Sequence, residues 1–348
     1  MSLERENLPP VTAVLVNWNG LKWLKSFLHA LLATDYSDFQ ILIVDNASTD
    51  ESLAWLAQNH PEIHVLQHDR NAGFAEGNNL ALPFIKTPFF ALVNTDVEVT
   101  PGWLRPLVLA LLNDPQKAAV QPKIRAQTKK DSFEYAGAAG GFIDQWGYSF
   151  CRGRIFEALE VDKGQYDTPL PVFWTSGACM LIRTETVQRI GLFEASFFAH
   201  WEEIDWCWRA QNYGYSLGVV PESLVYHVGG GTLAAESPRK LYLNLRNSLF
   251  TFVRNAPLGR AIQLVFFRVI LDAVLVLREL MRGRWRTFGV VLHAHLDFYA
   301  GLPAAIRSRK GRPRRAFLHL PGVSKGSIVH TYFVQRIKRY SELKSGKP

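Results

Sequence analysis

The chain has 348 residues, of which 48% are apolar, and a formal net charge of +8. This length accommodates one large domain or two ordinary ones, and the apolar content excludes an intrinsically disordered chain. The charge is unevenly divided, because residues 239–348 hold 22 of the 39 Lys and Arg but only 4 of the 31 Asp and Glu. Residues 1–238 therefore carry a net charge of −10 and residues 239–348 one of +18, which indicates two regions with different partners.

The cysteines and the first residues indicate a cytoplasmic protein. Cys151, Cys179 and Cys207 show neither CxxC spacing nor the spacing of a metal finger, which fits a reducing compartment. Residues 1–10 lack the apolar core of a signal peptide, so we do not expect secretion.

Strand-like and helix-like patterns alternate over the first hundred residues. Apolar, β-branched runs predict short buried strands, and apolar residues spaced by three and four predict helices between them. Ser48 or Thr49 is placed to cap the second helix, which we expect to run to Ala57. The alternation predicts an α/β fold with a mostly parallel sheet flanked by helices. The expected strands are 11–16, 41–44, 64–67 and 89–93, and the other expected helices are 21–32 and 75–85.

Polar residues follow three of these strands at the point where each strand ends. Asn17 follows the first strand, Asp45 the second, and Asn94-Thr95-Asp96 the fourth. The carboxyl ends of parallel strands meet at one edge of a sheet, and open α/β sheets bind their ligands there. We therefore expect the ligand site at this edge.

The middle of the chain has a weaker pattern. Residues 125–170 are rich in Gly and aromatic residues and lack a clear period, so we interpret them as loops and short strands. Regular structure is expected again at 172–183, in a partly helical segment at 197–213 and in a final strand at 219–227.

The basic region begins with two apolar segments, 241–253 and 261–280, which are expected to be helical. Arg268, Asp272 and Arg278 interrupt the second segment, and a charge at the centre of a bilayer costs about 2.5–3.5 kcal/mol. This favours a helix lying in an anionic membrane surface over a spanning helix. Two basic clusters strengthen this interpretation: Arg282, Arg284 and Arg286, and Arg307, Arg309, Lys310, Arg312, Arg314 and Arg315.

Two other interpretations of the basic region are open. Its helices could pack on the rest of the chain or on another subunit. Its charge could also serve nucleic-acid binding, but no recognition motif accompanies it, so we do not expect a nucleic-acid partner.

Acidic side chains follow the fourth strand. Asp96 and Glu98 offer the hard oxygen ligands that suit Mg²⁺ or Mn²⁺. A diphosphate bound at this edge would retain the cation and be neutralised by it. The alternative is that Asn94 and Asp96 only shape the turn before Thr100.

A second acidic cluster comprises Glu202, Glu203 and Asp205, which lie among tryptophans. Carboxyl groups near bulky aromatic rings can have raised pKa values and act as general bases. Asp205 can pair with Arg209 one helical turn later, so we assign the base role to Glu203.

A single histidine, His227, ends the last expected strand and is followed by the glycine run 229–231. An isolated histidine is usually structural, but the glycines permit close approach of the backbone to a ligand. A neutral imidazole could complete a metal site with Asp96. The run lacks the GK[ST] ending of a P-loop.

Together these motifs resemble those of inverting family 2 glycosyltransferases of the GT-A fold, and within them bacterial rhamnosyltransferases of cell-surface polysaccharide assembly. The resemblance covers roughly residues 10–235. It rests on the number and order of the motifs Val14-Leu15-Val16-Asn17-Trp18-Asn19, Val44-Asp45-Asn46-Ala47-Ser48-Thr49-Asp50, Asn71-Ala72-Gly73-Phe74, Asn94-Thr95-Asp96, Ser176-Gly177-Ala178, Glu202-Glu203-Ile204-Asp205 and His227.

The resemblance implies a role for each motif. Asp45 would contact the nucleotide base, Asp96 and His227 would bind the metal, and Glu203 would stand where relatives carry the catalytic Asp of a Glu-Asp pair. Asn94 replaces the first acid of the family's Asp-x-Asp motif. The remaining nucleotide-sugar residues would be Val16, Asn17, Asn71, Gly73, Asn78, Asn94 and Thr95, and the acceptor or donor pocket would include Trp174, Ser176, Gly177, Trp201 and Glu202.

The resemblance also implies a domain organisation and a reaction. Residues 10–123 would bind the nucleotide-sugar and residues 124–238 the acceptor. Residues 239–348 lie outside the resemblance, and their charge and apolar pattern lead us to expect association with the inner face of the cell membrane. The donor would be a dTDP- or UDP-linked sugar and the acceptor a lipid-linked glycan. The Gln-x-x-Arg-Trp motif of processive members is absent after His227, which favours transfer of one or a few sugars.

Overall fold

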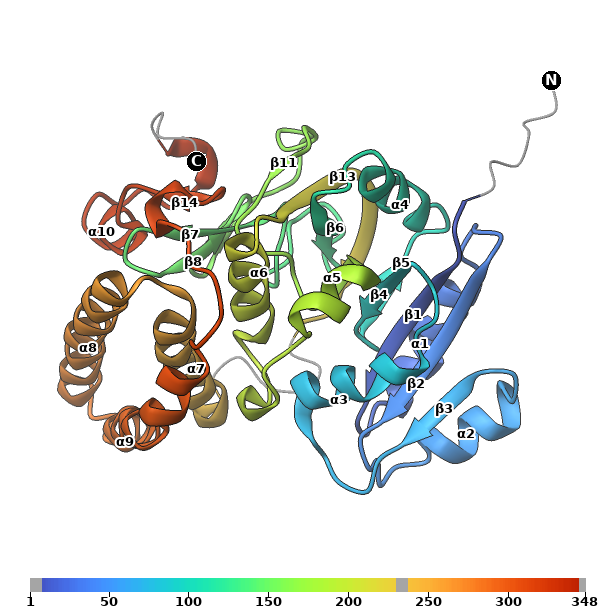
Figure 1. The fold of residues 1–348 in the computed structure, drawn as a ribbon, viewed down its shortest axis with the longest axis horizontal. Helices are drawn as coiled ribbons and strands as arrows, with labels where there is room; N and C mark the ends of the chain where they lie inside the picture. Colours follow the sequence, from blue (N-terminus) through green and yellow to red (C-terminus); the bar gives the residue numbers. More distant parts are fainter. Residues whose placement is uncertain (1–7, 230–236, 344–348) are drawn as a thin grey trace.

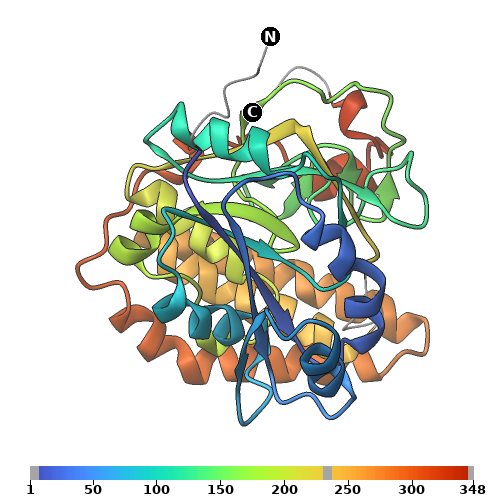
Figure 2. The ribbon, with the colours of Figure 1, turned by 90° about the vertical axis from the view of Figure 1, so that its right-hand side faces the viewer.

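One nine-stranded sheet forms the centre of the computed structural model, which describes residues 8–229 and 237–343 (Figures 1 and 2). Gly230 and Gly231 of the glycine run therefore lie outside the described residues. One half of the sheet is parallel, in the order β3-β2-β1-β4, and all four strands occur where the sequence predicts them. These strands are β1 (Val11–Asn17), β2 (Phe39–Asp45), β3 (His64–Gln67) and β4 (Phe89–Val93).

The other half of the sheet is mixed and consists of β5 (Val97–Val99), β6 (Lys117–Ala126), β11 (Leu170–Pro171), β12 (Cys179–Arg183) and β13 (Ser216–His227). Strand β12 runs antiparallel to both β4 and β6, and β13 runs parallel to β6. Strand β5 pairs antiparallel with β13, opposite its last residues. This pairing brings the end of β13 beside the segment that follows β4.

Helices cover both faces of the sheet, as the alternation predicts. They are α1 (Leu21–Leu32), α2 (Ser52–Asn59), α3 (Gly73–Ala81), α4 (Leu104–Leu112), α5 (Thr184–Ile190) and α6 (Glu202–Asn212). Successive residues of β1 point to opposite faces, as a strand requires. Ala13 packs in one core with α1, α2 and α4, and Val14 packs in the other with α3, α5 and α6.

The predicted cap of the second helix is wrong. Helix α2 begins at Ser52 and neither Ser48 nor Thr49 caps it. The Ser48 hydroxyl instead accepts hydrogen bonds from Asn17 Nδ2 at 3.1 Å and from the backbone N–H of Asn19 at 2.9 Å. These side chains therefore join the ends of two strands.

Three other boundaries differ from the prediction. The helix expected over 75–85 ends at Ala81 and continues as a 3₁₀ turn, Leu82–Phe84, because Pro83 cannot donate the next helical hydrogen bond. The regular structure expected from residue 172 begins only at Cys179. The strand ending at His227 is not the last one, since β14 (Val323–Ser324) follows.

A second, five-stranded sheet lies beside the first and occupies the segment interpreted as loops and short strands. Its order is β10-β9-β8-β7-β14. Strand β14 comes from the basic region and pairs parallel with β7, so the two regions of opposite charge share a core. The other strands are β7 (Gly141–Asp144), β8 (Ser149–Cys151), β9 (Arg154–Ile155) and β10 (Ala158–Leu159).

The basic region consists mainly of three long helices, α7 (Pro238–Asn255), α8 (Leu258–Met281) and α9 (Arg286–Arg307), followed by the short α10 (Ile328–Phe333). Helix α7 packs against α6, while α8 and α9 lie outside α7, on the opposite side of the molecule from β1–β3 (Figure 1). Within residues 8–229 and 237–343, no helix combines the length and apolar character needed to cross a bilayer.

Candidate active site

Two parallel strand ends meet at a buried carboxylate. Asp45, the last residue of β2, is 1% exposed and lies opposite Asn17, the last residue of β1. Its Oδ1 accepts a hydrogen bond from Asn17 Nδ2 at 2.9 Å, and its Oδ2 accepts one from the backbone N–H of Ser48 at 2.9 Å. Val16 lies beside this pair and faces Gly77 of α3. The structure therefore assembles Val16, Asn17 and Asp45 at the expected edge, and their contacts with a nucleotide stay a prediction.

The start of α3 closes over this edge through side-chain amides. Asn46 Nδ2 donates to the carbonyl of Gly73 at 2.9 Å, and Asn71 Oδ1 accepts from the Gly73 N–H at 3.0 Å. Gly73 has a φ of +80°, and a Cβ there would lie 2.5 Å from the carbonyl oxygen of Phe198. Asn78 is 1% exposed one turn later in α3. The loop that precedes α6 therefore rests directly on the predicted donor segment.

Asp96 and His227 come together although 131 positions separate them in the sequence. Pairing of β13 with β5 sets His227 opposite Val97, and its Nε2 lies 3.1 Å from Asp96 Oδ1. The other ring nitrogen, Nδ1, lies 3.0 Å from Glu134 Oε2. The imidazole is thus held between two carboxylates and is 5% exposed.

Both carboxylates determine the charge of His227. Burial disfavours the imidazolium, but the hydrogen bond and charge of Asp96 and those of Glu134 outweigh it and raise the pKa to about 10. In the metal-free protein this ring is therefore cationic and neutralises two acids.

These side chains fit a divalent cation. A carboxylate oxygen and an imidazole nitrogen are suitable ligands, and their separation of 3.1 Å matches adjacent ligands of an octahedral ion with bonds of about 2.1–2.2 Å. Glu134 behind Nδ1 would orient the ring, as carboxylates behind metal-bound histidines do. Among the residues that the structure describes, no group of three His, Cys, Asp or Glu side chains is arranged as a metal site. A cation would therefore need further ligands from a diphosphate and water.

Glu98 lies away from this pair. Its Oε1 forms an ion pair with Lys130 Nζ at 3.0 Å, and the amide of Gln127 approaches its Oε2 at 3.5 Å. We therefore leave Glu98 out of the metal site. Glu134, which contacts His227, was not identified from the sequence because it lies in the segment that shows no periodic pattern.

The Ser176-Gly177-Ala178 turn joins the two halves of the site. The Ala178 carbonyl accepts from the Asn94 N–H at 2.9 Å, so it fixes the segment that carries Thr95 and Asp96. On the other side, a Cβ at Gly177 would lie 3.9 Å from Glu203 Cβ. The turn therefore places the predicted base across from the Asp96 segment.

The two carboxyl groups at the start of α6 are both perturbed by burial. Desolvation raises the pKa of Glu203 to about 7, while a hydrogen bond from the Glu202 side chain lowers it. Desolvation and the charge of Glu203 raise the pKa of Glu202 well above its usual range. Glu202 thus stays protonated beside an ionisable Glu203. Neither Oε2 has a hydrogen-bond partner among the described residues.

The predicted pocket tryptophans are mostly enclosed by protein. Trp174 is 4% exposed, and its Nε1 donates to the carbonyl of Phe142 at 3.0 Å. Trp201 is 6% exposed and packs edge-on against Phe252 of α7. Ser176 is 1% exposed, with its N–H donating to Gln121 Oε1 at 3.0 Å. Their roles in a pocket stay predictions.

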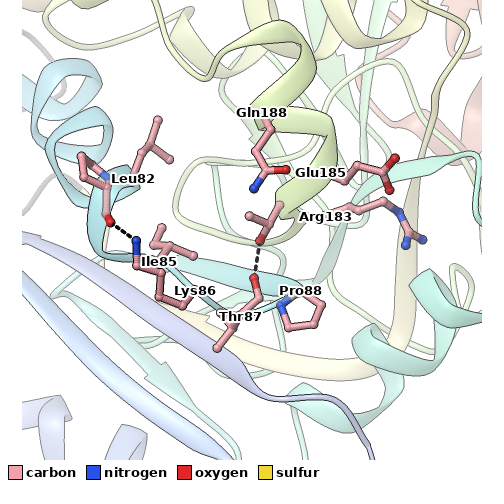
Figure 3. Close-up of a pocket in the computed structure, with 10 residues that line it drawn as sticks. Leu82, Ile85, Lys86, Thr87, Pro88, Arg183, Glu185 and Gln188 are labelled. Carbon is pink, nitrogen blue, oxygen red and sulfur yellow. Dashed lines mark hydrogen bonds between the residues drawn. The ribbon is translucent and has the colours of Figure 1, made fainter.

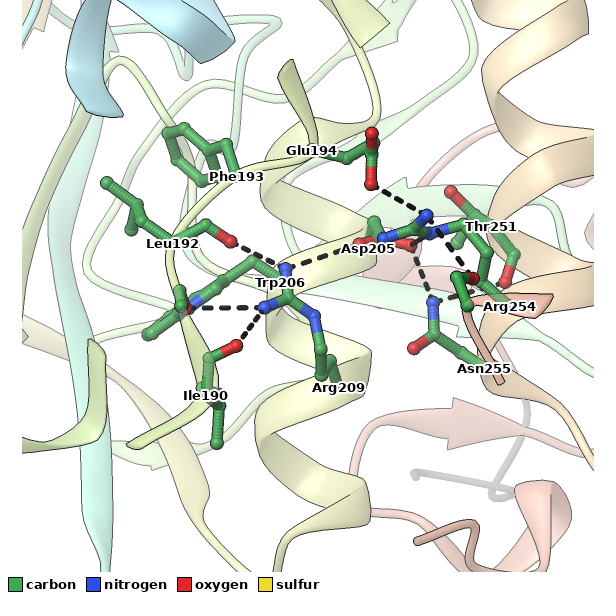
Figure 4. Close-up of polar contacts among 12 residues, drawn as sticks. Ile190, Leu192, Phe193, Glu194, Asp205, Trp206, Arg209, Thr251, Arg254 and Asn255 are labelled. Atoms are coloured by element: carbon green, nitrogen blue, oxygen red, sulfur yellow. Dashed lines mark hydrogen bonds and ion pairs between the residues drawn. The ribbon is translucent and has the colours of Figure 1, made fainter. Parts of the chain in front are cut away.

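Asp205 is structural, as the predicted pairing with Arg209 implies. The two side chains approach to 3.4 Å, and Asp205 Oδ1 also accepts from Arg254 Nε at 3.2 Å and Asn255 Nδ2 at 2.7 Å (Figure 4). Burial raises the pKa of Asp205, but Arg254, Arg209 and the Asn255 hydrogen bond outweigh it and lower the pKa overall. Arg254 also pairs with Glu194 at 2.7 Å, so α7 is tied both to the segment before α6 and to the first turn of α6.

The loop before Glu203 has an unusual backbone. Phe198, His200 and Trp201 have φ values of 64°, 67° and 71°, a region that residues other than glycine rarely occupy. The Asn247 amide, fully buried in α7, donates to the carbonyls of Phe197 and Ala199 at 3.0 Å and of His200 at 2.7 Å. One side chain of α7 therefore holds the backbone that delivers Glu203. The role of Asn247 was not identified from the sequence.

Asn247→Leu should lower kcat about 100-fold, because loss of these hydrogen bonds displaces the loop and a 1 Å displacement of a catalytic group can cost that much. The KM for the donor should change little, and steady-state kinetics separates the two. Asn244→Ala is the control, since Asn244 makes one bond within α7, to the Lys240 carbonyl at 2.7 Å. A normal kcat in the Asn247 variant would show that the Asn247 hydrogen bonds are not needed to position Glu203.

A hollow of about 500 Å³ lies at the opposite edge of the sheet (Figure 3). It is formed by the segment before β4 and the start of α5, where Thr184 Oγ1 donates to the Thr87 carbonyl at 2.7 Å. Asp96 follows the other end of β4. The hollow therefore lies away from the strand ends that carry the predicted site.

Comparison with known sequences identifies the family of this chain. The sequence model described as glycosyl transferase family 2 matches residues 12–191. The chain is 20% identical over 322 residues to the low-salt glycan biosynthesis hexosyltransferase Agl10 of Haloferax volcanii, covering 90% of this chain and 96% of the relative. It is 25% identical over 233 residues to the N-acetylglucosaminyl-diphospho-decaprenol L-rhamnosyltransferase of Mycobacterium tuberculosis, covering 62% and 74% of the two chains.

Solved structures support the same assignment at the level of the fold. GalNAc-T7, solved with UDP, GalNAc and Mn²⁺, has a TM-score of 0.56 and 17% identity, covering 72% of this chain and 48% of that longer chain. The Pyrobaculum calidifontis mannosyltransferase PcManGT, solved with GDP-Man and Mn²⁺, has a TM-score of 0.51 and 14% identity over 84% and 88% of the two chains. The fold is that of GT-A glycosyltransferases, and the chain belongs to glycosyl transferase family 2.

Proposed function

We propose that this glycosyltransferase moves one sugar, with rhamnose as a candidate, from a nucleoside-diphosphate donor to an acceptor hydroxyl, with inversion at the anomeric carbon. The observation that carries the proposal is the placement of Glu203 and of the Asp96 segment on the two sides of the Ser176-Gly177-Ala178 turn. A carboxylate opposite a leaving diphosphate suits a single displacement, in which the acceptor oxygen attacks from the face away from the nucleotide.

Each group then has a defined task. Ionised Glu203 takes the proton from the hydroxyl group of the acceptor. The protonated Glu202 beside it stabilises the ionised form of Glu203 by a hydrogen bond. Asp45 and the end of β1 hold the nucleotide, and Asn71, Gly73 and Asn78 form the donor side. Asp96 and His227 would hold Mg²⁺ or Mn²⁺, which supplies charge neutralisation to the diphosphate when bound. The presence of Mn²⁺ in GalNAc-T7 and PcManGT supports this choice.

The name of one relative supports a lipid-linked glycan as acceptor, and from such an acceptor we infer a cell-envelope role. The name of the mycobacterial relative specifies a decaprenol diphosphate carrier, and the Shigella flexneri relative, 22% identical over 285 residues, is described as a dTDP-rhamnosyl transferase. We infer that this chain uses a dTDP- or UDP-linked sugar and works peripherally at the inner face of the membrane, where such carriers are accessible.

Two other functions fit the residues less well. A nucleotidyltransferase would carry a glycine-rich loop with Arg or Lys after β1, but that loop is Asn17-Trp18-Asn19-Gly20. A scaffold that binds sugar or lipid without catalysis would not need a Glu203 whose pKa is raised, across the Ser176-Gly177-Ala178 turn from the Asp96 segment.

A donor screen tests the proposal. The purified protein is incubated with a panel of nucleotide-sugars, a polyprenyl-diphosphate-linked sugar and Mn²⁺ or Mg²⁺. We expect acceptor-dependent release of nucleoside diphosphate from one donor and loss of release with chelator. No release from any donor would favour the scaffold. A separate incubation with nucleoside triphosphates and sugar 1-phosphates tests the nucleotidyltransferase, which would release pyrophosphate from the triphosphate.

A further inference from the structure

Helix α8 exposes an apolar stripe along its whole length. Its large exposed side chains recur every three or four residues, which places them on one face of the helix. They are between 43% and 63% exposed and comprise Leu258, Ile262, Phe266, Ile270, Val274 and Leu277.

Helix α9 continues this surface beyond a short turn. Met281 and Trp285, which flank the turn, are 74% and 71% exposed. The same spacing of three and four then recurs along α9, where the exposed side chains are Phe288, Leu292, Leu296 and Tyr299. Both helices lie outside α7 and contact each other (Figure 1), so the two stripes belong to neighbouring helices. We refer to the exposed apolar residues of both helices as the outer surface of the α8–α9 hairpin.

Two ionised residues in the middle of α8 are buried. Arg268 and Asp272 are 8% and 3% exposed and form an ion pair at 2.8 Å. His295 of α9 approaches the same aspartate at 3.0 Å, so a polar cluster lies between the helices beside the buried apolar residues Val291, Ala294 and Phe298. A hairpin that faces water normally exposes polar and charged residues rather than a continuous row of large apolar side chains. The exposed stripe therefore indicates an apolar environment outside the hairpin.

The turn between the helices is basic. Arg278, Arg282 and Arg284 surround one carboxylate, Glu279, at 2.9–3.3 Å, so positive charge is in excess. The guanidinium side chains remain 45%, 56% and 68% exposed. Part of the second basic cluster is structural. Arg309 donates a hydrogen bond to the Val253 carbonyl, and Arg314 donates one to the Arg309 carbonyl.

We propose that the outer surface of the α8–α9 hairpin docks in the surface of an anionic bilayer, with its apolar stripe among the acyl chains. The exposed arginines of the turn would contact acidic headgroups. The hairpin would lie in the plane of the membrane and would not span it. Its helix α8 contains a buried ion pair, and no helix among the described residues is long and apolar enough to cross a bilayer. The inference rests on the proposed function for its biological purpose, but its evidence is the hairpin alone.

Flotation of the full-length protein with vesicles tests this docking. We expect binding to vesicles of phosphatidylcholine with phosphatidylglycerol, and weaker binding to phosphatidylcholine alone. Phe266→Ser combined with Leu277→Ser should weaken binding about tenfold or more, because it removes two large side chains from the stripe. Phe84→Ser with Leu112→Ser is the matched control, at 49% and 44% exposure elsewhere on the molecule, and should float normally.

Two outcomes would overturn the proposal. One is unchanged flotation of the Phe266 and Leu277 double variant. The other is a wild-type dimer in sedimentation equilibrium that the double variant abolishes, which would assign the stripe to a second copy of the chain. Nucleoside diphosphate release with a short, water-soluble acceptor should be the same in the double variant and the wild type. If release fails in both while flotation depends on the stripe, the catalytic proposal fails and the docking stands.

Discussion

Glu203→Gln is expected to lower kcat about 10²–10⁴-fold, the contribution of a positioned general base, while nucleotide affinity stays unchanged. The substitution keeps the shape of the side chain but removes the only group at the start of α6 that ionises near neutral pH. Glutamine cannot accept the acceptor proton, and the Asp96 and His227 pair is untouched. Single-turnover kinetics with saturating donor measures the loss, and calorimetric titration with nucleoside diphosphate measures the affinity.

The neighbouring residue provides a matched control. Glu202 is held protonated by burial and by the charge of Glu203, so Glu202→Gln keeps an uncharged hydrogen-bond donor in the same place. We expect kcat to fall less than about tenfold for this variant, the scale of one neutral hydrogen bond. Equal losses in both variants would remove Glu203 from the base role, as would near-normal turnover in Glu203→Gln.

The pH dependence follows from the raised pKa of Glu203. The base acts only when ionised, so kcat should rise as the pH passes upward through about 7 and should level off above it. A profile that falls over this range would assign the limiting group to an acid instead. In Glu203→Gln the rising limb should disappear from the residual rate.

The parallel half of the fold could be predicted from the sequence, because each of its strands and helices has its own local pattern. The predicted first and last residues of β4 match the structure. Those of α1 match as well, since Gly20 and the apolar spacing mark this helix. The errors arose where tertiary contacts override local signals. Ser48 has the side chain of a helix cap, but at a strand end it bonds to Asn17 instead. Strand β14 has two residues, too few for any pattern.

Among the site residues, too, those marked by local patterns were predicted and those that depend on tertiary contacts were not. Asp45 and Asp96 each follow a predicted strand, and Glu203 lies in an acidic cluster among tryptophans, so local sequence patterns indicated all three. They did not indicate Glu134, because its approach to His227 depends on an irregular segment folding back along β6, where its N–H donates to the Ile124 carbonyl. Asn247 was equally invisible, since its partners are the backbone carbonyls of a loop whose left-handed residues have no glycine to reveal them.

Asp96→Ala should weaken nucleoside-diphosphate binding in the presence of Mn²⁺ by about 100-fold or more, since even groups behind a metal ligand contribute about 10–100-fold. The residual affinity should no longer depend on the metal. The reason is the pairing with His227: without a cation the imidazolium neutralises Asp96 and Glu134, and a cation would replace its proton. Calorimetry in buffers of different ionisation enthalpy should therefore detect proton release on metal binding in the wild type and lose it in the variant.

Glu98→Ala separates loss of a ligand from loss of nearby negative charge. Glu98 follows Asp96 by two residues, but its carboxylate pairs with Lys130 at 3.0 Å and lies apart from His227. We expect this variant to bind Mn²⁺ and nucleotide like the wild type, because its charge is already neutralised. If Asp96→Ala retained metal-dependent affinity while Glu98→Ala lost it, the metal site would move to Glu98. If both variants kept it, the ion would have to be held by the diphosphate and His227 alone, and Asp96 would serve only to orient the ring.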